Sequence, residues 1–323
     1  MPDKFTEEFV NKLSLPVIAA PMFLVSSPDL VIEACRSGII GSFPLLNART
    51  SEILEEWMVR ITGELKSADN AAPWAVNIIV HKSNKRYKQD LELIKKYQPP
   101  VVITSLGHPG EVVEIVHQYG GLVFSDVIHL VHARKAAQTG VDGLILVCNG
   151  AGGHAGTINP IAFTGAVKEF WEGFTILAGC INNGQDILAA EALGADLVYM
   201  GTRFIASEES FASSEYKTML IDSSFEDLIY TDAFSGVNAN YLTPSIRNAG
   251  LDPEQLKRKE QVDVSHLDAS EAKAWKDIWS AGQGVNSIKK VAPVKDIVEE
   301  LKRDYDRSLE RLVKKNEKAN SMQ

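Results

Sequence analysis

A histidine stands in the middle of a glycine-rich segment, LVCNGAGGHAGTINP, at residues 146–160. The segment also fits the pattern G-x-G-x-x-A, but a dinucleotide-binding loop has to open a helix at once and belong to the first βα unit. Here an irregular run, GTINP, comes before the next helix. We therefore expect Gly152 and Gly153 to let the backbone fold tightly beneath a ligand, and His154 to act on that ligand as an acid or base.

Two more glycine turns, AGCINNGQD at 178–186 and MGTRF at 200–204, each follow an apolar run. Glycines expose backbone N–H groups, and the first turn leads into a helix whose N-terminus is expected at Gln185–Asp186. Because the two turns end neighbouring strands, both can contact one phosphate. The pair predicts a cofactor that carries a phosphate group.

Asn77 is a polar residue inside an otherwise apolar run, WAVNIIV. A buried amide needs hydrogen-bond partners, and these can come from the core or from a ligand. The sequence leaves both interpretations open. Another apolar run ends in AAPM at 19–22, where we expect backbone amides and an apolar side chain to face the same site.

Eight short apolar runs alternate with amphipathic helical segments and would position these residues. The runs are 16–22, 38–44, 74–80, 100–106, 121–127, 143–149, 174–180 and 196–202. Apolar strands of this length suit a parallel sheet that is covered on both faces. A doubly wound sheet would carry its nucleotide loop after the first strand, whereas the glycine loops here follow the sixth to eighth. We therefore predict an α/β fold, a (β/α)8 TIM barrel.

The alternation of strands and helices stops after MGTRF. Residues 206–270 are polar and mainly helical in pattern, so we expect an inserted helical subdomain over the mouth of the barrel. The barrel then comprises residues 1–205 and 271–323. Its last segment, 293–318, has the pattern of one long amphipathic helix.

The composition excludes several classes of protein. A formal net charge of −9 argues against a nucleic-acid-binding surface. No apolar stretch approaches the ~20 residues of a membrane span, and residues 1–20 lack a basic segment followed by a long apolar run, so we expect a cytoplasmic protein. Because Cys35, Cys148 and Cys180 are far apart, we expect small buried side chains and no disulfide or metal site.

With these residues in view, the chain resembles the nitronate monooxygenase (2-nitropropane dioxygenase) family of FMN-dependent barrels. The motifs that carry the resemblance are LPVIAAPM, AGGHAG, LAGCINNGQDILAAEALGADLVYMGTRF and IWSAGQGV. The resemblance implies a TIM barrel with an inserted helical subdomain and a non-covalently bound FMN. It also implies the oxidation of alkyl nitronates, or of nitroalkanes, by O2 to a carbonyl compound and nitrite.

The resemblance also implies roles for individual residues. His154 would be the catalytic base, or the group that holds the nitro oxygens beside the flavin. The residues expected to contact the cofactor are Ala20, Pro21, Met22, Asn77, Ser125, Gly152, Gly153, Gly179, Cys180, Gly201, Thr202, Ala281, Gly282 and Gln283. Of these, the glycine-turn residues Gly179, Cys180, Gly201 and Thr202 would hold the phosphate, and the others would lie against the flavin ring or next to it.

One position departs from the family pattern. Some relatives carry a lysine near the flavin at the end of the fifth strand, where this chain has Ser125 and Asp126 in FSDVIHL. A cation there would stabilise an anionic reduced flavin, and an acid would not. The difference leaves open whether this chain uses another electron donor.

Three alternatives to nitronate oxidation remain open. Relatives on this scaffold reduce quinones or enoyl thioesters with NAD(P)H. A phosphosugar isomerase or lyase would use the same phosphate turns, although the chain has no lysine near the ends of the eight strands. A flavin-binding protein without catalytic activity is the third. The oligomeric state is also open, a homodimer included.

Overall fold

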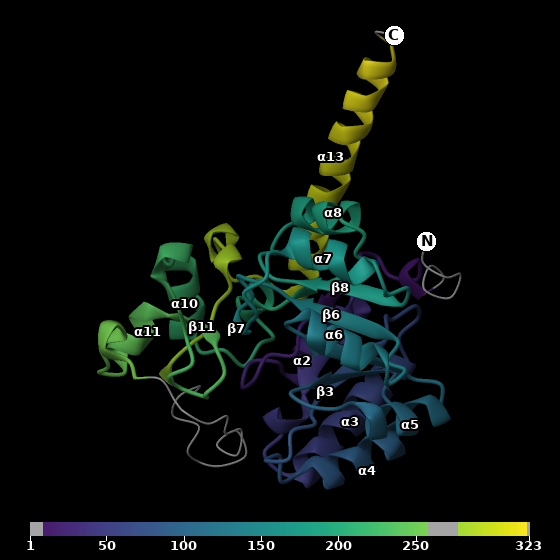
Figure 1. Ribbon diagram of the computed structural model, residues 1–323, viewed down its shortest axis with the longest axis vertical. Helices are drawn as coiled ribbons and strands as arrows, with labels where there is room; N and C mark the ends of the chain where they lie inside the picture. Colours follow the sequence, from purple (N-terminus) through teal and green to yellow (C-terminus); the bar gives the residue numbers. More distant parts are fainter. Residues whose placement is uncertain (1–8, 258–276, 322–323) are drawn as a thin grey trace.

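Eight parallel strands close into a barrel in the order β1-β2-β3-β4-β5-β6-β8-β9. The architecture is that of a computed structural model, which describes residues 9–257 and 277–321 (Figure 1). The barrel strands are β1 Val17–Ala19, β2 Ile40–Pro44, β3 Trp74–Ile79, β4 Val101–Ser105, β5 Leu122–Val127, β6 Gly143–Val147, β8 Phe174–Ala178 and β9 Leu197–Met200. Each strand lies inside one of the eight apolar runs, so the predicted TIM barrel is confirmed.

Helices follow each of the first seven barrel strands and cover the outside of the barrel. They are α2 Pro28–Arg36, α3 Ser51–Lys66, α4 Tyr87–Tyr97, α5 Gly110–Gln118, α6 Leu130–Ala137, α7 Pro160–Lys168 and α8 Gly184–Ala192, with a 3-10 turn, η1 Leu45–Asn47, before α3. The helix after β9, α9 Thr202–Ile205, is a single turn. The ring of helices is closed by α13, Val294–Ser321, which packs against α8 and α2.

Side chains alternate between the two faces of each barrel strand, and each face belongs to its own apolar cluster. On β5, Leu122 and Phe124 point into the barrel and pack with its interior. Val123 and Val127 point outward and pack with the surrounding helices. The same alternation therefore decides which side chain of each strand reaches the mouth of the barrel.

Side-chain caps fix the starts of several helices. The Ser27 Oγ accepts from the Leu30 N–H at 2.9 Å at the start of α2, and the Asn183 Oδ1 accepts from the Asp186 N–H at 2.8 Å at the start of α8. Caps of this kind each stabilise a helix by about 1 kcal/mol. They set where the loops at the mouth of the barrel end.

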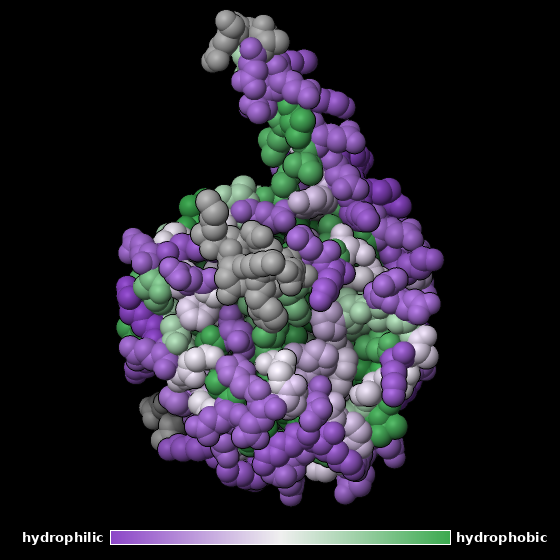
Figure 2. Space-filling view, turned by 90° about the vertical axis from the view of Figure 1, so that its right-hand side faces the viewer, coloured by the Kyte–Doolittle hydropathy of each residue, from purple (hydrophilic) through white to green (hydrophobic). Residues whose placement is uncertain are grey.

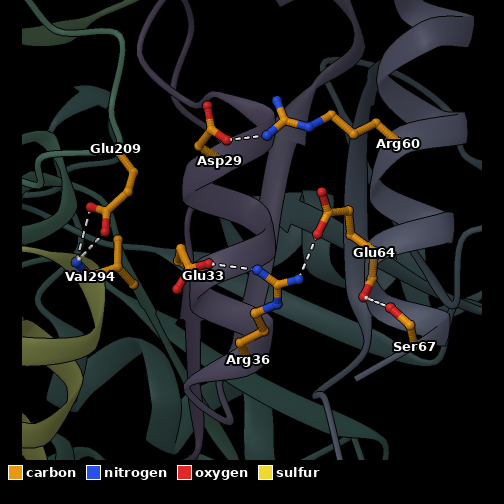
Figure 3. Close-up of polar contacts among 8 residues, drawn as sticks. All are labelled: Asp29, Glu33, Arg36, Arg60, Glu64, Ser67, Glu209 and Val294. Atoms are coloured by element: carbon orange, nitrogen blue, oxygen red, sulfur yellow. Dashed lines mark hydrogen bonds and ion pairs between the residues drawn. The ribbon is translucent and has the colours of Figure 1, made fainter. Parts of the chain in front are cut away.

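Charged side chains tie neighbouring helices together on the outside of the barrel (Figure 3). The guanidinium of Arg36 on α2 contacts Glu33 at 3.0 Å and Glu64 of α3 at 2.6 Å. At the start of α13, both carboxylate oxygens of Glu209 accept from the Val294 N–H at 3.0 Å. An acid at this end also complements the helix dipole, so the segment after β9 helps to fix α13.

The segment after α9 forms a separate layer beside the mouth of the barrel (Figure 1). Its helices are α10 Ser214–Asp222 and α11 Thr243–Asn248, with the 3-10 turns η2 Phe225–Asp227 and η3 Pro253–Gln255. It also contains two strands, β10 Leu228–Thr231 and β11 Ala239–Leu242, which the sequence pattern did not predict. The boundary that we expected at residue 270 lies outside the described residues.

The C-terminal half of α13 projects from the body of the protein, and Figure 2 shows hydrophobic surface along it. Leu309, Leu312 and Val313 are 41%, 49% and 48% exposed. In the part of the chain that the structure describes, no helix combines the length and the apolar character that a membrane crossing requires.

Candidate active site at the mouth of the barrel

A cavity of about 240 Å³ opens at the carboxyl ends of the barrel strands. Twelve of the residues predicted as site residues line it: Ala20, Pro21, Met22, Asn77, Gly152, Gly153, His154, Gly179, Cys180, Gly201, Thr202 and Gly282. They come from β3 and from the segments that follow β1, β6, β8 and β9, together with the returning segment near residue 282. The structure thus brings together residues that are far apart in the sequence.

The floor of the cavity is a polar layer on top of an apolar barrel. Below it, the interior is filled by aliphatic and aromatic side chains such as Ile103 and Phe124. The next inward-facing positions on β3, β4, β5 and β9 are polar; they are Asn77, Ser105, Asp126 and Tyr199, and all four line the cavity. Polar groups at this level need partners, and the cavity is where a ligand could supply them.

A chain of hydrogen bonds runs across this floor. The Asn77 Nδ2 donates to the Ser105 Oγ at 2.7 Å and to the Ile103 carbonyl at 3.3 Å. The Ser105 hydroxyl in turn donates to the Asp126 Oδ2 at 2.6 Å. Both amide hydrogens of Asn77 are therefore used, so a ligand would meet this side chain only at its oxygen.

Asp126 keeps one carboxyl oxygen without a partner. Its Oδ1 is buried and accepts no hydrogen bond from the described residues. Burial raises the pKa of Asp126 to about 6, although the hydrogen bond from Ser105 opposes the shift. The pKa of Tyr199 is also raised, by burial first and then by the nearby Asp126 carboxylate. The floor therefore holds an acid that titrates close to neutral pH.

Ser125, the neighbouring residue that we expected to contact the cofactor, lies on the other face of β5. It is 4% exposed and follows Val123 on the side that packs against the helices, and it does not line the cavity. The period of two along a strand explains why Asp126 faces the cavity instead.

The two glycine turns lie side by side at another part of the rim. Gly179 and Cys180 have φ angles of 119° and 59°, which turn the chain sharply after β8. Within residues 9–257 and 277–321, the N–H groups of Cys180 and Thr202 donate to no protein acceptor. The atoms nearest to a Cβ at Gly201 would be side-chain atoms of Ala20 and Met22, at ordinary distances of 3.7 Å. This corner offers donors and space for an anionic group.

Two expectations about this corner are wrong. Cys35 and Cys148 are buried as expected, but Cys180 is exposed because the left-handed turn brings it to the rim of the cavity. The N-terminus of α8 is not open to an anion. The Gln185 N–H donates to the Asp304 carboxylate of α13 at 3.2 Å, and the Asp186 N–H donates to the Asn183 side chain.

The returning segment is fixed onto the loops after β6 and β9. The Gly282 N–H donates to the Thr202 Oγ1 at 2.9 Å, and the Gln283 N–H donates to the Gly150 carbonyl at 2.9 Å. Gln283 begins a 3-10 turn, η5 Gln283–Ser287. Neither Ala281 nor Gln283 lines the cavity; Ala281 is fully buried, and the Gln283 side chain approaches the Cys180 Sγ at 3.8 Å.

His154 lies on a short strand, β7 Gly153–His154, that pairs with β11 of the inserted segment. Its Nε2 is 3.1 Å from the Ser235 Oγ, and the side chain lines the cavity. The inserted segment also holds the loop around it: the Asn240 side chain donates to the Ala151 carbonyl at 2.7 Å, and the Tyr230 hydroxyl donates to the Ala155 carbonyl at 2.8 Å. The insert therefore positions the histidine.

An aromatic pair forms another wall of the cavity. The rings of Tyr216, on α10, and Trp279 are stacked with centroids 4.9 Å apart. The Tyr216 hydroxyl donates to the Ser280 carbonyl at 2.5 Å, and the Ser280 Oγ is buried without a described partner. A flat or apolar ligand could pack against this wall.

Comparison with known proteins agrees with this architecture. The sequence model of the family described as nitronate monooxygenase matches residues 7–304. The chain belongs to the nitronate monooxygenase family. Membership of the nitronate monooxygenase family makes it an oxidoreductase.

One curated relative and two solved structures each match almost the whole chain. A nitronate monooxygenase from Paraburkholderia phytofirmans is 25% identical, over 92% of this chain and 94% of its own length. FabK from Thermotoga maritima has a TM-score of 0.79 at 24% identity, over 97% of this chain and 99% of that one. A nitroalkane oxidase from Streptomyces ansochromogenes has a TM-score of 0.79 at 24% identity, over 94% and 99%. The two structures share the fold of this chain.

Several residues of the cavity carry no signal in the sequence. Ser105 and Tyr199 lie within apolar runs and outside the glycine turns, although the alternation of each strand places them inward. Tyr216, Trp279 and Ser280 come from the insert and the returning segment, where no strand pattern signals which side chain reaches the site.

Proposed function

We propose that the chain binds FMN in the cavity at the barrel mouth and oxidises alkyl nitronates to a carbonyl compound and nitrite, with O2 as the final electron acceptor. The match of the family model over residues 7–304 carries the proposal. The cavity supports it, because one rim offers backbone donors for a phosphate and another presents His154.

The residues around the cavity fit the chemistry of FMN. The phosphate would rest on the N–H groups of Cys180 and Thr202, next to the space above Gly201. Three residues that line the cavity each hold a buried polar atom without a described protein partner; the atoms are the Asp126 Oδ1, the Asn182 Oδ1 and the Ser280 Oγ. Buried polar atoms of this kind are expected to meet a ligand or water. The apolar side chain of Met22 and the Tyr216–Trp279 pair would contact the ring.

FMN would supply the redox chemistry, taking electrons from the substrate and passing them to O2. The protein would contribute placement and proton transfer. His154 would remove the proton from the carbon of a neutral nitroalkane, or hold the nitro oxygens of a nitronate. The imidazole suits the first role because its ordinary pKa lies near neutral pH.

The proposal can be tested on the purified protein. We expect FMN to be retained through a desalting column, and riboflavin, which lacks the phosphate, to bind at least tenfold more weakly. A preparation that binds no FMN would refute the proposal.

Anaerobic mixing then identifies the electron donor. We expect a nitronate to bleach the flavin and, on return of O2, to yield nitrite. Rapid bleaching by NADH without any nitrite from nitronates would favour the reductase alternative, with quinones or enoyl thioesters as acceptors. Bound flavin that no nitronate or NADH bleaches would favour a binding protein without catalytic activity.

A further inference from the structure

The floor of the cavity contains a carboxyl group, that of Asp126, whose negative charge is not balanced by a cation from the described residues that line the cavity. Asp126 lines the cavity; its Oδ2 accepts from Ser105, and its Oδ1 is buried without a described partner. No lysine or arginine lines the cavity among the residues that the structure describes. The other titratable side chains that line it are Tyr199 from β9, His154 from β7, Cys180 after β8 and Tyr216 from α10. None of them is a permanent cation.

Asp126 lies across the barrel from the corner formed by the two glycine turns. The corner is formed after β8 and β9, whereas the chain from Asn77 through Ser105 to Asp126 lies on β3, β4 and β5 across the barrel. A ligand held by its phosphate at the corner would extend its other end over the floor. For FMN that end would be the ring, which gains negative charge on reduction.

We propose that Asp126 takes up a proton when bound FMN is reduced, so that the polar floor couples electron transfer to proton uptake. This inference rests on the proposed function. Two electrons enter the flavin from the nitronate, or from dithionite in a test, and one proton goes to the flavin ring. A second proton passes from solvent to the Asp126 carboxylate, which becomes a neutral carboxyl group.

Electrostatics supports this assignment. Extra negative charge close to a carboxylate favours its protonated form. Burial has already raised the pKa of Asp126 to about 6, so a moderate further increase carries it through neutral pH. The pKa of Tyr199 is raised by burial and by the Asp126 charge, so its hydroxyl stays neutral and cannot take up the proton. Ser105 donates to the carboxylate and opposes its protonation. Replacing Ser105 should therefore shift the pH range over which Asp126 takes up the proton.

The test is the midpoint potential of the FMN-loaded protein as a function of pH. Between about pH 6 and pH 8, wild type should take up one proton more per two electrons than Asp126→Asn. One proton changes the equilibrium constant tenfold per pH unit, which is about 30 mV for a two-electron couple. Glu114→Gln removes an exposed carboxylate on α5 and should keep the wild-type slope. Ser105→Ala should keep the steep slope but shift its start to a higher pH.

An infrared difference spectrum between the oxidised and reduced protein locates the proton. We expect a band of a protonated carboxyl group on reduction of wild type, absent from Asp126→Asn. Equal slopes in wild type and Asp126→Asn would overturn the inference while leaving nitronate oxidation intact. If Asp126→Asn loses the steeper slope but wild type shows no such band, the proton is bound at another group, and this result would also overturn the inference. Failure to bind FMN would remove both this inference and the proposed function.

Discussion

The position of His154 on β7 gives it a partner from the inserted segment and a place at the cavity. If it removes the proton from a neutral nitroalkane, His154→Ala should lower kcat/KM for that substrate by about 10²–10⁴-fold. FMN binding should remain. Nitrite release in air measures the activity, and the flavin spectrum measures the bound cofactor.

Preformed nitronate separates the two roles of His154, because it has already lost the proton. A base would be needed only for the nitroalkane, so the variant should then oxidise the nitronate at close to the wild-type rate. Equal losses with both substrates would assign the histidine to holding the nitro oxygens. A fully active variant would exclude both roles.

The raised pKa of Asp126 also predicts how the stability of the cofactor-free protein depends on pH. Its folded pKa of about 6 lies above the value of about 3.9 expected in the unfolded chain, so the folded state binds the proton more tightly. Stability is therefore lost as the pH rises from about 4 through about 6. Because part of the carboxyl faces the open cavity, the cost is about 1–2 kcal/mol rather than the full shift.

Asp126→Asn removes this cost. We expect the cofactor-free variant to be more stable than wild type by about 1–2 kcal/mol at pH 8, and equal to it near pH 4. Urea unfolding at several pH values measures the difference. A variant that is less stable at pH 8 would show that the buried carboxylate has partners that the geometry does not reveal.

At the scale of the elements, the contact between α8 and α13 depends on one glycine. A Cβ at Gly184 would lie 2.1 Å from the backbone nitrogen of Tyr305 and 2.3 Å from the carbonyl oxygen of Leu301. These are backbone atoms, so Gly184→Ala has to move the two helices apart and should cost at least about 1–3 kcal/mol. Gly165→Ala on α7 meets nothing within 4 Å and should instead gain about 0.5–1 kcal/mol. Chemical denaturation of both variants checks the pair, and a neutral Gly184→Ala would contradict the close packing.

The elements of the barrel could be predicted because each strand is a local apolar run of the expected length. The pairing of β7 with β11 could not, because it joins His154 to Ala239 and no local pattern connects them. The occupied N-terminus of α8 was missed for the same reason, since its partner Asp304 lies on the last helix. By contrast, the inward position of Asp126 could be predicted from the sequence, because the alternation along β5 places Asp126 inward and Ser125 outward.

For the whole molecule, α13 divides into a packed half and a projecting half. Leu301 is 3% exposed against the core, whereas Leu309 and Leu312 are 41% and 49% exposed. Removing residues 309–323 should therefore change the free energy of unfolding by less than about 1 kcal/mol. Leu301→Ala should cost about 2–4 kcal/mol, as burial predicts. Thermal unfolding measures both, and a large loss on truncation would show that the projecting half contacts another molecule.

The closure of the barrel also has a consequence during synthesis. Strand β1 pairs on one side with β2 and on the other with β9, through Ala19 and Met200. During translation, the first strand therefore stays unpaired on this side until Met200, 181 positions after Ala19, has been made. Until then the nascent chain carries two unpaired strand edges, which favour association with other chains. Fragments that stop before residue 197 should accordingly need chaperones to stay in solution, whereas the full barrel has no such edge.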